Sequence, residues 1–178
     1  MEFQTLHSEV AYHGRAFNVR RDQLRLPDGN LAHLDVVEHI GAVTILPLDD
    51  EGRIWFVRQY RHPAAQELLE LPAGTLEAGE PPEACAKREI REETGLAAES
   101  MLELGRFFLA PGYSTEFMYV YLARGLHPDP LPHDQDEFLR AEAHPLAEVY
   151  RMVENGEIQD GKTLAALLLG QRWRGRSA

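Results

Sequence analysis

The sequence has 178 residues, of which 44% are hydrophobic and 26% charged, and its formal net charge at pH 7 is −11. These values are typical of one soluble domain with an accessory element. The negative charge argues against nucleic acid as a partner, because such binding needs a basic surface. The only cysteine, Cys85, leaves no intrachain disulfide. No signal-peptide pattern and no membrane-spanning apolar run is visible, so we expect a cytoplasmic protein without a membrane partner.

The first part of the chain predicts antiparallel strands within residues 9–41. Phe17 and Val19 lead into Leu24 and Leu26, and the turn-forming residues 27–30 separate this strand from a returning one over 31–37. Strands alone in this number rarely build an independent core. We therefore divide the chain into an N-terminal strand element, residues 1–41, and a main domain, residues 42–178.

The main domain begins with a predicted pair of strands. The apolar run 42–48 predicts a buried strand, residues 49–53 predict a turn, and residues 54–60 predict the next strand. We expect these two strands to form a hairpin. A short strand over 68–71 then leads into a loop containing glycine and proline.

Residues 84–94 favour a helix, because prolines 81 and 82 are tolerated in a first turn and Gly95 suits a left-handed helix end. The remaining predicted elements are strands at 101–108 and 117–123, an exposed loop at 127–136, and helices at 146–153 and 162–173. A strand-rich chain with one inserted loop and helix and with helices at its end is typical of an α+β fold or an α/β/α sandwich.

Three carboxylates cluster on the predicted central helix. Glu89, Glu92 and Glu93 have the i, i+3 and i+4 spacing that places side chains on one helix face. Such a cluster needs a positive charge, and Mg²⁺ is the hard cation that prefers oxygen ligands together with substrate phosphates. A single glutamate at such a position would ordinarily belong to a solvated face; the cluster predicts a metal site.

The segment around this helix resembles the signature of the Nudix hydrolases. The match covers nine fixed positions: Gly74, Glu80, Arg88, Glu89, Ile90, Glu92, Glu93, Gly95 and Leu96. The resemblance implies an α/β/α sandwich in which a loop-helix-loop holds Mg²⁺ or Mn²⁺. It also implies hydrolysis of a nucleoside diphosphate linked to another moiety, with water attacking one phosphorus while metal ions neutralise the phosphate oxygens.

The resemblance also implies roles for the matching residues. Glu89 and Glu93 would be direct metal ligands, and Glu92 a further ligand or a holder of water. Arg88 would orient the glutamates, and the carbonyl of Ala73 would be an additional ligand. Two roles stay open for Glu80, a structural one and a metal contact. Cys85 is expected to be a buried packing residue rather than a nucleophile.

Outside the signature, the chain is similar to the ADP-ribose pyrophosphatase branch of this family. The branch carries a proline where Pro111 stands, fifteen positions beyond Leu96, and segments 57–61 and 70–74 are similar as well. The implied substrate is ADP-ribose, cleaved to AMP and ribose 5-phosphate. The alternatives are another nucleotide-sugar such as GDP-mannose, or a noncatalytic nucleotide-sensing domain, against which the intact signature argues.

Several side chains are candidates for contacts with the substrate. Arg61 is the leading one, because a guanidinium makes bidentate contacts with phosphate oxygens. Arg58 would face the same way only if its strand were bulged. Glu70 and Glu116 could contact substrate or ribose, with a salt bridge and a solvated strand end as the respective alternatives. For the base that activates water we choose Glu137, in the acidic stretch 134–137.

In the resembling branch, the N-terminal strands exchange across a two-fold dimer and approach the adenine. The resemblance therefore implies a homodimer formed through residues 1–41. Phe17 would stack on the base, and Arg20 and Arg21 are candidates for phosphate contact. The alternative is a sheet packed on its own subunit.

Overall fold

The computed structural model describes residues 2–132 and 138–171, which divide into two compact units. One unit comprises Met1–Gly41 and Phe107–Phe117, and the other comprises Ala42–Arg106 and Met118–Ala178. The first unit includes Phe107–Phe117, which the division of the sequence at position 41 assigns to the main domain. No helix of the described residues is long and apolar enough to cross a membrane.

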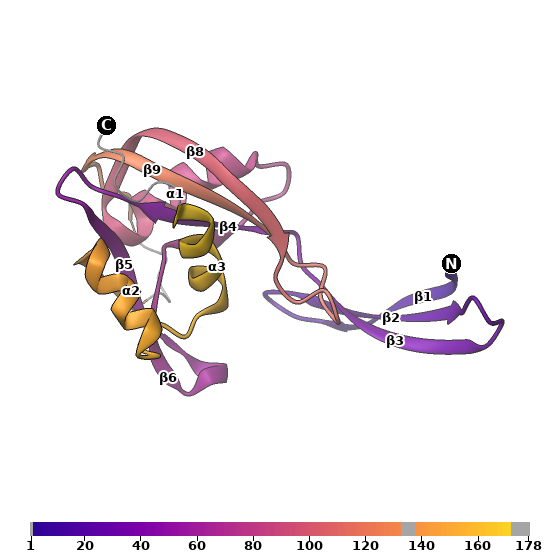
Figure 1. Ribbon diagram of the computed structural model, residues 1–178. Coiled ribbons are helices and arrows are strands. Elements are labelled where there is room, and N and C mark those ends of the chain that lie inside the picture. Colours follow the sequence, from indigo (N-terminus) through magenta and orange to yellow (C-terminus); the bar gives the residue numbers. More distant parts are fainter. Residues whose placement is uncertain (1, 133–137, 172–178) are drawn as a thin grey trace. The chain divides into compact units, whose positions relative to one another are not determined.

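The first unit is built on an antiparallel sheet of three strands in the order β1-β2-β3. The strands are β1 (Gln4–His13), β2 (Asn18–Arg25) and β3 (Leu31–Glu38), so the sheet begins earlier than position 9 (Figure 1). Gly29 has φ 89° in the turn between β2 and β3, a conformation that favours glycine. The segment 107–117 bridges to this sheet, because the amide of Val37 donates to the carbonyl of Tyr113 at 2.8 Å.

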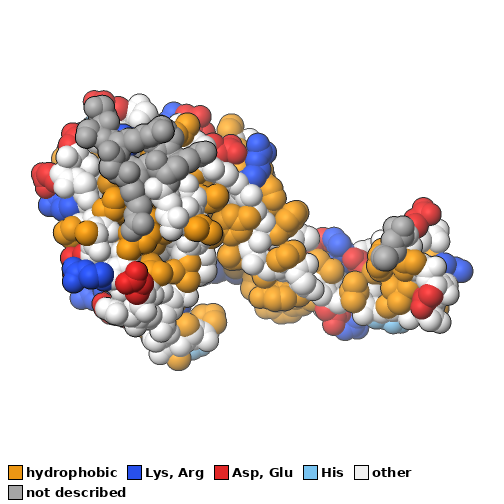
Figure 2. Space-filling model, viewed as in Figure 1, with side chains coloured by type: hydrophobic (Ala, Val, Ile, Leu, Met, Phe, Trp, Pro, Cys, Tyr) orange, Lys and Arg blue, Asp and Glu red, His pale blue; other side chains and the backbone are white. Residues whose placement is uncertain are grey.

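This sheet buries few of its apolar side chains. Every residue of β1 is exposed, and Figure 2 shows hydrophobic side chains at the surface of the sheet. The exposed apolar residues of its strands and connections are Phe3, Leu6, Val10, Tyr12, Phe17, Leu31 and Leu34. A three-stranded sheet with this exposure lacks a core of its own.

The second unit contains a four-stranded sheet in the order β7-β4-β9-β8. Its strands are β4 (Ala42–Pro47), β7 (Ala73–Thr75), β8 (Leu96–Phe108) and β9 (Phe117–Pro128). β4 pairs with β7 on one edge and runs parallel to β9 on the other, and all six of its residues are buried. The strands predicted at 101–108 and 117–123 are confirmed, and both are longer than predicted.

A second sheet of three strands has the order β10-β5-β6, with β5 (Arg53–Arg61), β6 (Gln66–Glu70) and β10 (Leu139–Pro145). A short 3₁₀ helix, His62–Ala64, joins β5 to β6. The hairpin predicted between 42–48 and 54–60 is wrong, because β4 and β5 belong to different sheets and share one isolated bridge, Leu48 to Ile54. Both edges of β4 are taken by other strands, so β5 pairs elsewhere.

Three α-helices of the described residues pack on these sheets (Figure 1). Helix α1 (Pro82–Thr94) covers the face of β4 that carries Val43 and Ile45, whereas α3 (Gly161–Gly170) approaches Leu46, which points to the opposite face. Helix α2 (Leu146–Glu154) contacts β5 and β10. Helices on both faces of the sheet confirm the predicted α+β sandwich. Positions 172–173 of the last predicted helix lie outside the described residues.

Candidate active site

Helix α1 is positioned by local sequence signals and by its apolar face. It starts at Pro82 and ends at Gly95, whose φ of 72° forms the left-handed end that the sequence predicts. Cys85, Ala86 and Ile90 are fully buried in the core against β4. Because the core fixes this face, the neighbouring Glu89 and Glu93 are held close to the sheet, with only 8% and 3% of their surfaces exposed.

Arg88 is the central cation of this helix. Its guanidinium donates to Glu80 at 3.0 and 3.1 Å, to Glu89 at 2.7 Å and to Glu92 at 2.9 Å. The hydrogen bond from Arg88 lowers the pKa of Glu80 to about 2, and the same bond raises the pKa of Arg88 itself. One guanidinium therefore holds three carboxylates in place. These are the contacts that Arg88 would need in order to orient the glutamates.

The loop before the helix holds the remaining glutamate. The amide of Ala73, in β7, donates to Glu93 at 2.9 Å. Gly74 follows, and a Cβ built there would lie 1.8 Å from a carboxylate oxygen of Glu89. Its φ is not among the positive values, so glycine is needed here for space rather than for backbone conformation. The signature glycine thus forms a cradle for the Glu89 carboxylate.

The donor chemistry of this region fits a hard divalent cation. Glu89, Glu92 and Glu93 bring carboxylates to one side of α1, and the Gly74 cradle brings Glu89 against the loop that carries Ala73. In the geometry described for residues 2–132 and 138–171, no group of three or more acidic, histidine or cysteine side chains converges on a single ion position. Arg88 instead holds Glu89 and Glu92 together.

Cys85 is buried, as the sequence predicts, and its thiol donates to the carbonyl of Thr75 at 3.6 Å. Burial raises the pKa of this thiol. A neutral thiol is a poor nucleophile, so Cys85 is a packing residue.

A second ion network joins β5, β6 and the start of α3. Arg61 donates to both carboxylate oxygens of Glu70 at 2.8 Å, and Lys162 pairs with the same carboxylate. Burial of Glu70 opposes its charged form, but the hydrogen bond from Arg61 and the charge of Lys162 keep its pKa below the ordinary value. Lys162 also pairs with Asp160 at 3.0 Å. The salt-bridge alternative for Glu70 is therefore the arrangement present.

Arg61 lies within the electrostatic field of the α1 glutamates. Its hydrogen bond with Glu70 is the main cause that raises its pKa, and the charge of Glu93 contributes as well. Its side chain is 40% exposed, against 1% for Glu70. The arginine predicted to hold a phosphate is thus partly exposed, and its charge interacts with that of Glu93 on the acidic helix.

Arg58 points away from Arg61. Both β5 ladders run without a register shift, so residues three apart on this strand lie on opposite faces. Arg58 instead pairs with Glu142 of β10 at 2.7 Å. The bulge that would bring Arg58 beside Arg61 is absent from these ladders.

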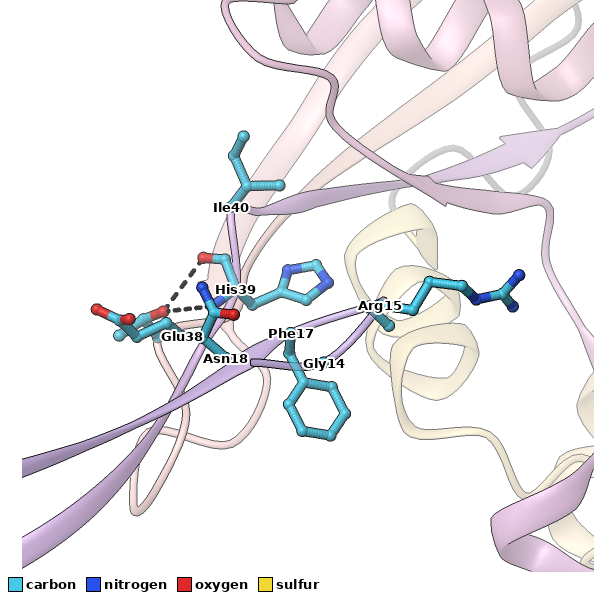
Figure 3. Close-up of a pocket in the computed structure, with 9 residues that line it drawn as sticks. Gly14, Arg15, Phe17, Asn18, Glu38, His39 and Ile40 are labelled. Carbon is cyan, nitrogen blue, oxygen red and sulfur yellow. Dashed lines mark hydrogen bonds between the residues drawn. The ribbon is translucent and has the colours of Figure 1, made fainter. Parts of the chain in front are cut away.

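The first unit places Phe17 at a pocket of about 400 Å³. Figure 3 shows Phe17, Glu38 and His39 at the ends of the strands that border it, with Arg15 pointing away from Glu38. The amide of His39 donates to the Thr115 hydroxyl at 2.9 Å, which ties the pocket to the segment 107–117. A half-exposed aromatic ring on a polar pocket is suited to stacking on a planar group.

Other predicted residues of this unit have carboxylate partners or backbone contacts. Arg20 donates to Asp22 at 2.8 Å, and Arg21 pairs with Asp35 at 2.9 Å. The amide of Glu116 donates to the Ser114 hydroxyl at 3.1 Å, which fixes the backbone there. Glu137, predicted as the base, lies outside the described residues.

Sequence reasoning missed Lys162 and Asp160. A usable signal was present, since a lysine in the first turn of a helix opposes the helix dipole and calls for a tertiary partner. That partner, Glu70, is far from Lys162 in the sequence, so the ion pair could not be predicted from a local pattern.

Comparison with known proteins decides the family. The family model described as NUDIX domain matches residues 38–167. The chain belongs to the Nudix family. It is 44% identical over 170 residues to the ADP-ribose pyrophosphatase of Mycobacterium tuberculosis (strain ATCC 25618 / H37Rv), covering 94% of this chain and 82% of that protein.

Two further comparisons agree with this assignment. The chain is 35% identical over 169 residues to the ADP-ribose pyrophosphatase of Bacillus subtilis (strain 168), covering 94% of this chain and 91% of that protein. A crystal structure described as an ADP compounds hydrolase superposes with a TM-score of 0.88 at 26% identity, covering 99% of this chain and 97% of that one. The Nudix fold predicted from the signature is confirmed.

Proposed function

We propose that this Nudix protein is a metal-dependent hydrolase that cleaves the pyrophosphate of ADP-ribose to AMP and ribose 5-phosphate. The observation that carries the chemistry is the loop-helix in which Arg88 and the Ala73 amide hold the signature glutamates. The choice of substrate is supported by the relatives named ADP-ribose pyrophosphatase, which are 44% and 35% identical over most of this chain.

In this proposal, Glu89 and Glu93 hold the divalent cation, with Glu92 and the Ala73 carbonyl as further donors. Mg²⁺ is the expected ion and Mn²⁺ a possible substitute. When bound, the cation neutralises charge on the phosphate oxygens and makes water a better nucleophile. Arg88 holds the carboxylates of Glu89 and Glu92 in place, which lowers the cost of assembling the ligand set when the substrate arrives.

Arg61 binds the diphosphate, since its side chain is partly exposed and its charge interacts with that of Glu93 on the acidic helix. Glu137 takes the proton from the attacking water. Glu116 contacts the ribose or supports the metal site, and Arg58 and Glu70 contribute through the ion pairs that shape β5.

Phe17 stacks on the adenine, and the protein is a homodimer formed through the N-terminal strands. The exposed apolar side chains of that sheet support this part of the proposal, because burial against a second copy would remove them from water. The proposed location is the cytoplasm, where a free buried thiol such as Cys85 stays reduced.

A substrate panel tests the proposal. ADP-ribose, GDP-mannose, NADH, FAD and diadenosine polyphosphates are incubated with the protein and Mg²⁺, and products are separated by chromatography. We expect ADP-ribose to have the highest kcat/KM, and chelation with EDTA to abolish turnover. A higher kcat/KM for GDP-mannose or another compound would overturn the choice of substrate and leave the family unchanged.

A variant pair separates catalysis from mere binding. Glu93→Gln should abolish turnover and weaken Mn²⁺ binding, whereas Glu83→Gln on the same helix should change neither, because Glu83 is exposed and pairs with Lys87. Absence of turnover in the wild type, with Mn²⁺ affinity unchanged in Glu93→Gln, would favour the noncatalytic sensing domain.

A further inference from the structure

The buried carboxylate of Glu70 has two cationic partners, one of which, Lys162, also pairs with Asp160. The Glu70 side chain is 1% exposed, and it receives both Arg61, through two hydrogen bonds of 2.8 Å, and Lys162. Neutralising a buried carboxylate takes one cation. The second cation therefore needs its own explanation.

Lys162 occupies a position that local preferences do not favour. It stands in the first turn of α3, where the helix dipole repels cations, and its side chain is only 13% exposed. Burying this long side chain also costs conformational entropy. The sequence has one other lysine, Lys87, which is exposed on α1. The position of Lys162 is therefore unfavourable in free energy, and its contacts with Glu70 and Asp160 offset this cost.

Asp160 fixes Lys162 in this position. It caps α3 by accepting hydrogen bonds from the amide and hydroxyl of Thr163 at 3.0 and 2.6 Å, and it pairs with Lys162 at 3.0 Å. The Thr163 hydroxyl accepts in turn from the amide of Leu71 at 2.8 Å, next to Glu70 in the chain. These contacts join the start of α3 to the end of β6, and they do not involve Arg61.

Arg61 is the member of the network that can leave. It is 40% exposed, and movement of its guanidinium toward an anion would break its bonds to Glu70. With Lys162 present, Glu70 keeps a cation when Arg61 turns away. Without Lys162, the same movement would strand a buried charge, which is strongly unfavourable.

We infer that Lys162 is a positioning residue for substrate binding, because it holds the charge of Glu70 and thereby releases Arg61 to the diphosphate. This inference rests on the proposed function of Arg61. Lys162 itself touches no substrate; it changes the fraction of molecules in which Arg61 is available, and apparent affinity scales with that fraction.

The central test is Lys162→Met, which keeps most of the unbranched side chain and removes its charge. KM for ADP-ribose should rise about tenfold or more, while kcat stays within about threefold, because Arg61 is retained by Glu70 before binding. The double variant Lys162→Met with Glu70→Gln should bring KM back to within about threefold of the wild type, because a neutral side chain no longer traps Arg61. Lys87→Met is the matched control and should leave both constants unchanged.

A second readout does not depend on turnover. In NMR spectra, the Nε–Hε signal of Arg61 should shift when inorganic pyrophosphate and Mg²⁺ are added to the wild type and to the double variant. At the same concentration it should shift little in Lys162→Met. If the wild type fails to hydrolyse ADP-ribose but shows this pattern, the substrate assignment fails and the inference stands.

Two results would overturn the inference. One is an unchanged KM in Lys162→Met. The other is a raised KM that Glu70→Gln does not restore, which would mean that Lys162 contacts the substrate or only supports the fold. Thermal unfolding of each variant is measured in parallel, and the double variant carries the test if Lys162→Met alone does not fold.

Discussion

Gly74→Ala isolates the positioning of one carboxylate from the stability of the fold. The added Cβ would lie 1.8 Å from one oxygen of Glu89 and 1.9 Å from its carboxylate carbon, so the carboxylate has to move by more than about 1 Å. A misplacement of about 1 Å in a reacting or ligating group can cost about 10²-fold in rate. We therefore expect kcat/KM for ADP-ribose to fall by about 10²-fold.

The free energy of unfolding should change far less. The Glu89 carboxylate is the end of a flexible side chain, and the φ of Gly74 is not in the left-handed region, so alanine fits the backbone. Alanine also restricts the unfolded chain, which contributes about 0.4–1 kcal/mol in its favour. We expect a net change within about 1–2 kcal/mol, in the range of ordinary substitutions.

The assay combines steady-state kinetics with urea unfolding on the same preparations. Gly161→Ala is the matched control, because a Cβ added at Gly161 contacts no atom within 4 Å and Gly161 is the first residue of α3. It should keep full activity and equal or slightly higher stability. If the activity of Gly74→Ala stays within threefold of the wild type, Gly74 is not needed to position the Glu89 carboxylate. If Gly74→Ala loses much stability, the loss of activity comes from the fold rather than from the position of this carboxylate.

Three further predictions follow from other contacts. Arg88→Met should destabilise the protein at pH 7. The folded pKa of Glu80 is about 2, against an ordinary value of 4.5. The difference in the free energy of unfolding between Arg88→Met and the wild type should therefore be fully present above pH 4.5 and shrink as the pH falls toward 2. If urea unfolding gives the same difference at all these pH values, the prediction is wrong. Glu137→Gln should lower kcat by about 10²–10⁴-fold with Mn²⁺ binding intact, and a loss below tenfold removes it as the base. Val10→Lys combined with Tyr12→Lys should convert the proposed dimer to a monomer in sedimentation; a wild type that sediments as a monomer refutes the dimer.

The parts of the fold that the sequence predicted well are those with local signals. Helix α1 has proline at its start and Gly95 at its end, and its apolar positions have helical spacing, so its bounds lie within two residues of the prediction. The turn between β2 and β3 contains the Pro-Asp-Gly-Asn sequence that favours it. These signals act over a few residues and need no knowledge of the rest of the chain.

Strand pairing could not be predicted in the same way. A tight turn follows β4 and favours a hairpin, but β4 is buried on both faces and takes β7 and β9 as neighbours, both distant in sequence. β10 was missed because its sequence, with two alanines and two charged residues, lacks the β-branched residues typical of strands. Its place is set by pairing along β5, a long-range contact.

The same difference between local signals and long-range contacts applies to the candidate site. The signature predicted Arg88 as the residue that orients the glutamates, because that role is local to one helix and its loop. The pair of Glu70 with Lys162 joins residues that are 92 positions apart, and no local pattern marks it. Residues that act by contact with a distant partner are found from the structure.

The two ion networks differ in their balance of charge: the network around Arg88 has more carboxylates than cations, and the network around Glu70 has two of each. Around Arg88, one guanidinium faces three carboxylates, so the helix keeps excess negative charge and attracts a divalent cation. Around Glu70, two cations share one buried carboxylate and Asp160, so one of them can turn toward an anion without leaving a buried charge alone. The overall charge of −11 repels a diphosphate, but physiological salt screens this repulsion at distances beyond about 8 Å. In the proposed function, substrate binding is therefore decided by these local arrangements, the glutamates that hold the divalent cation and the arginine that turns toward the diphosphate.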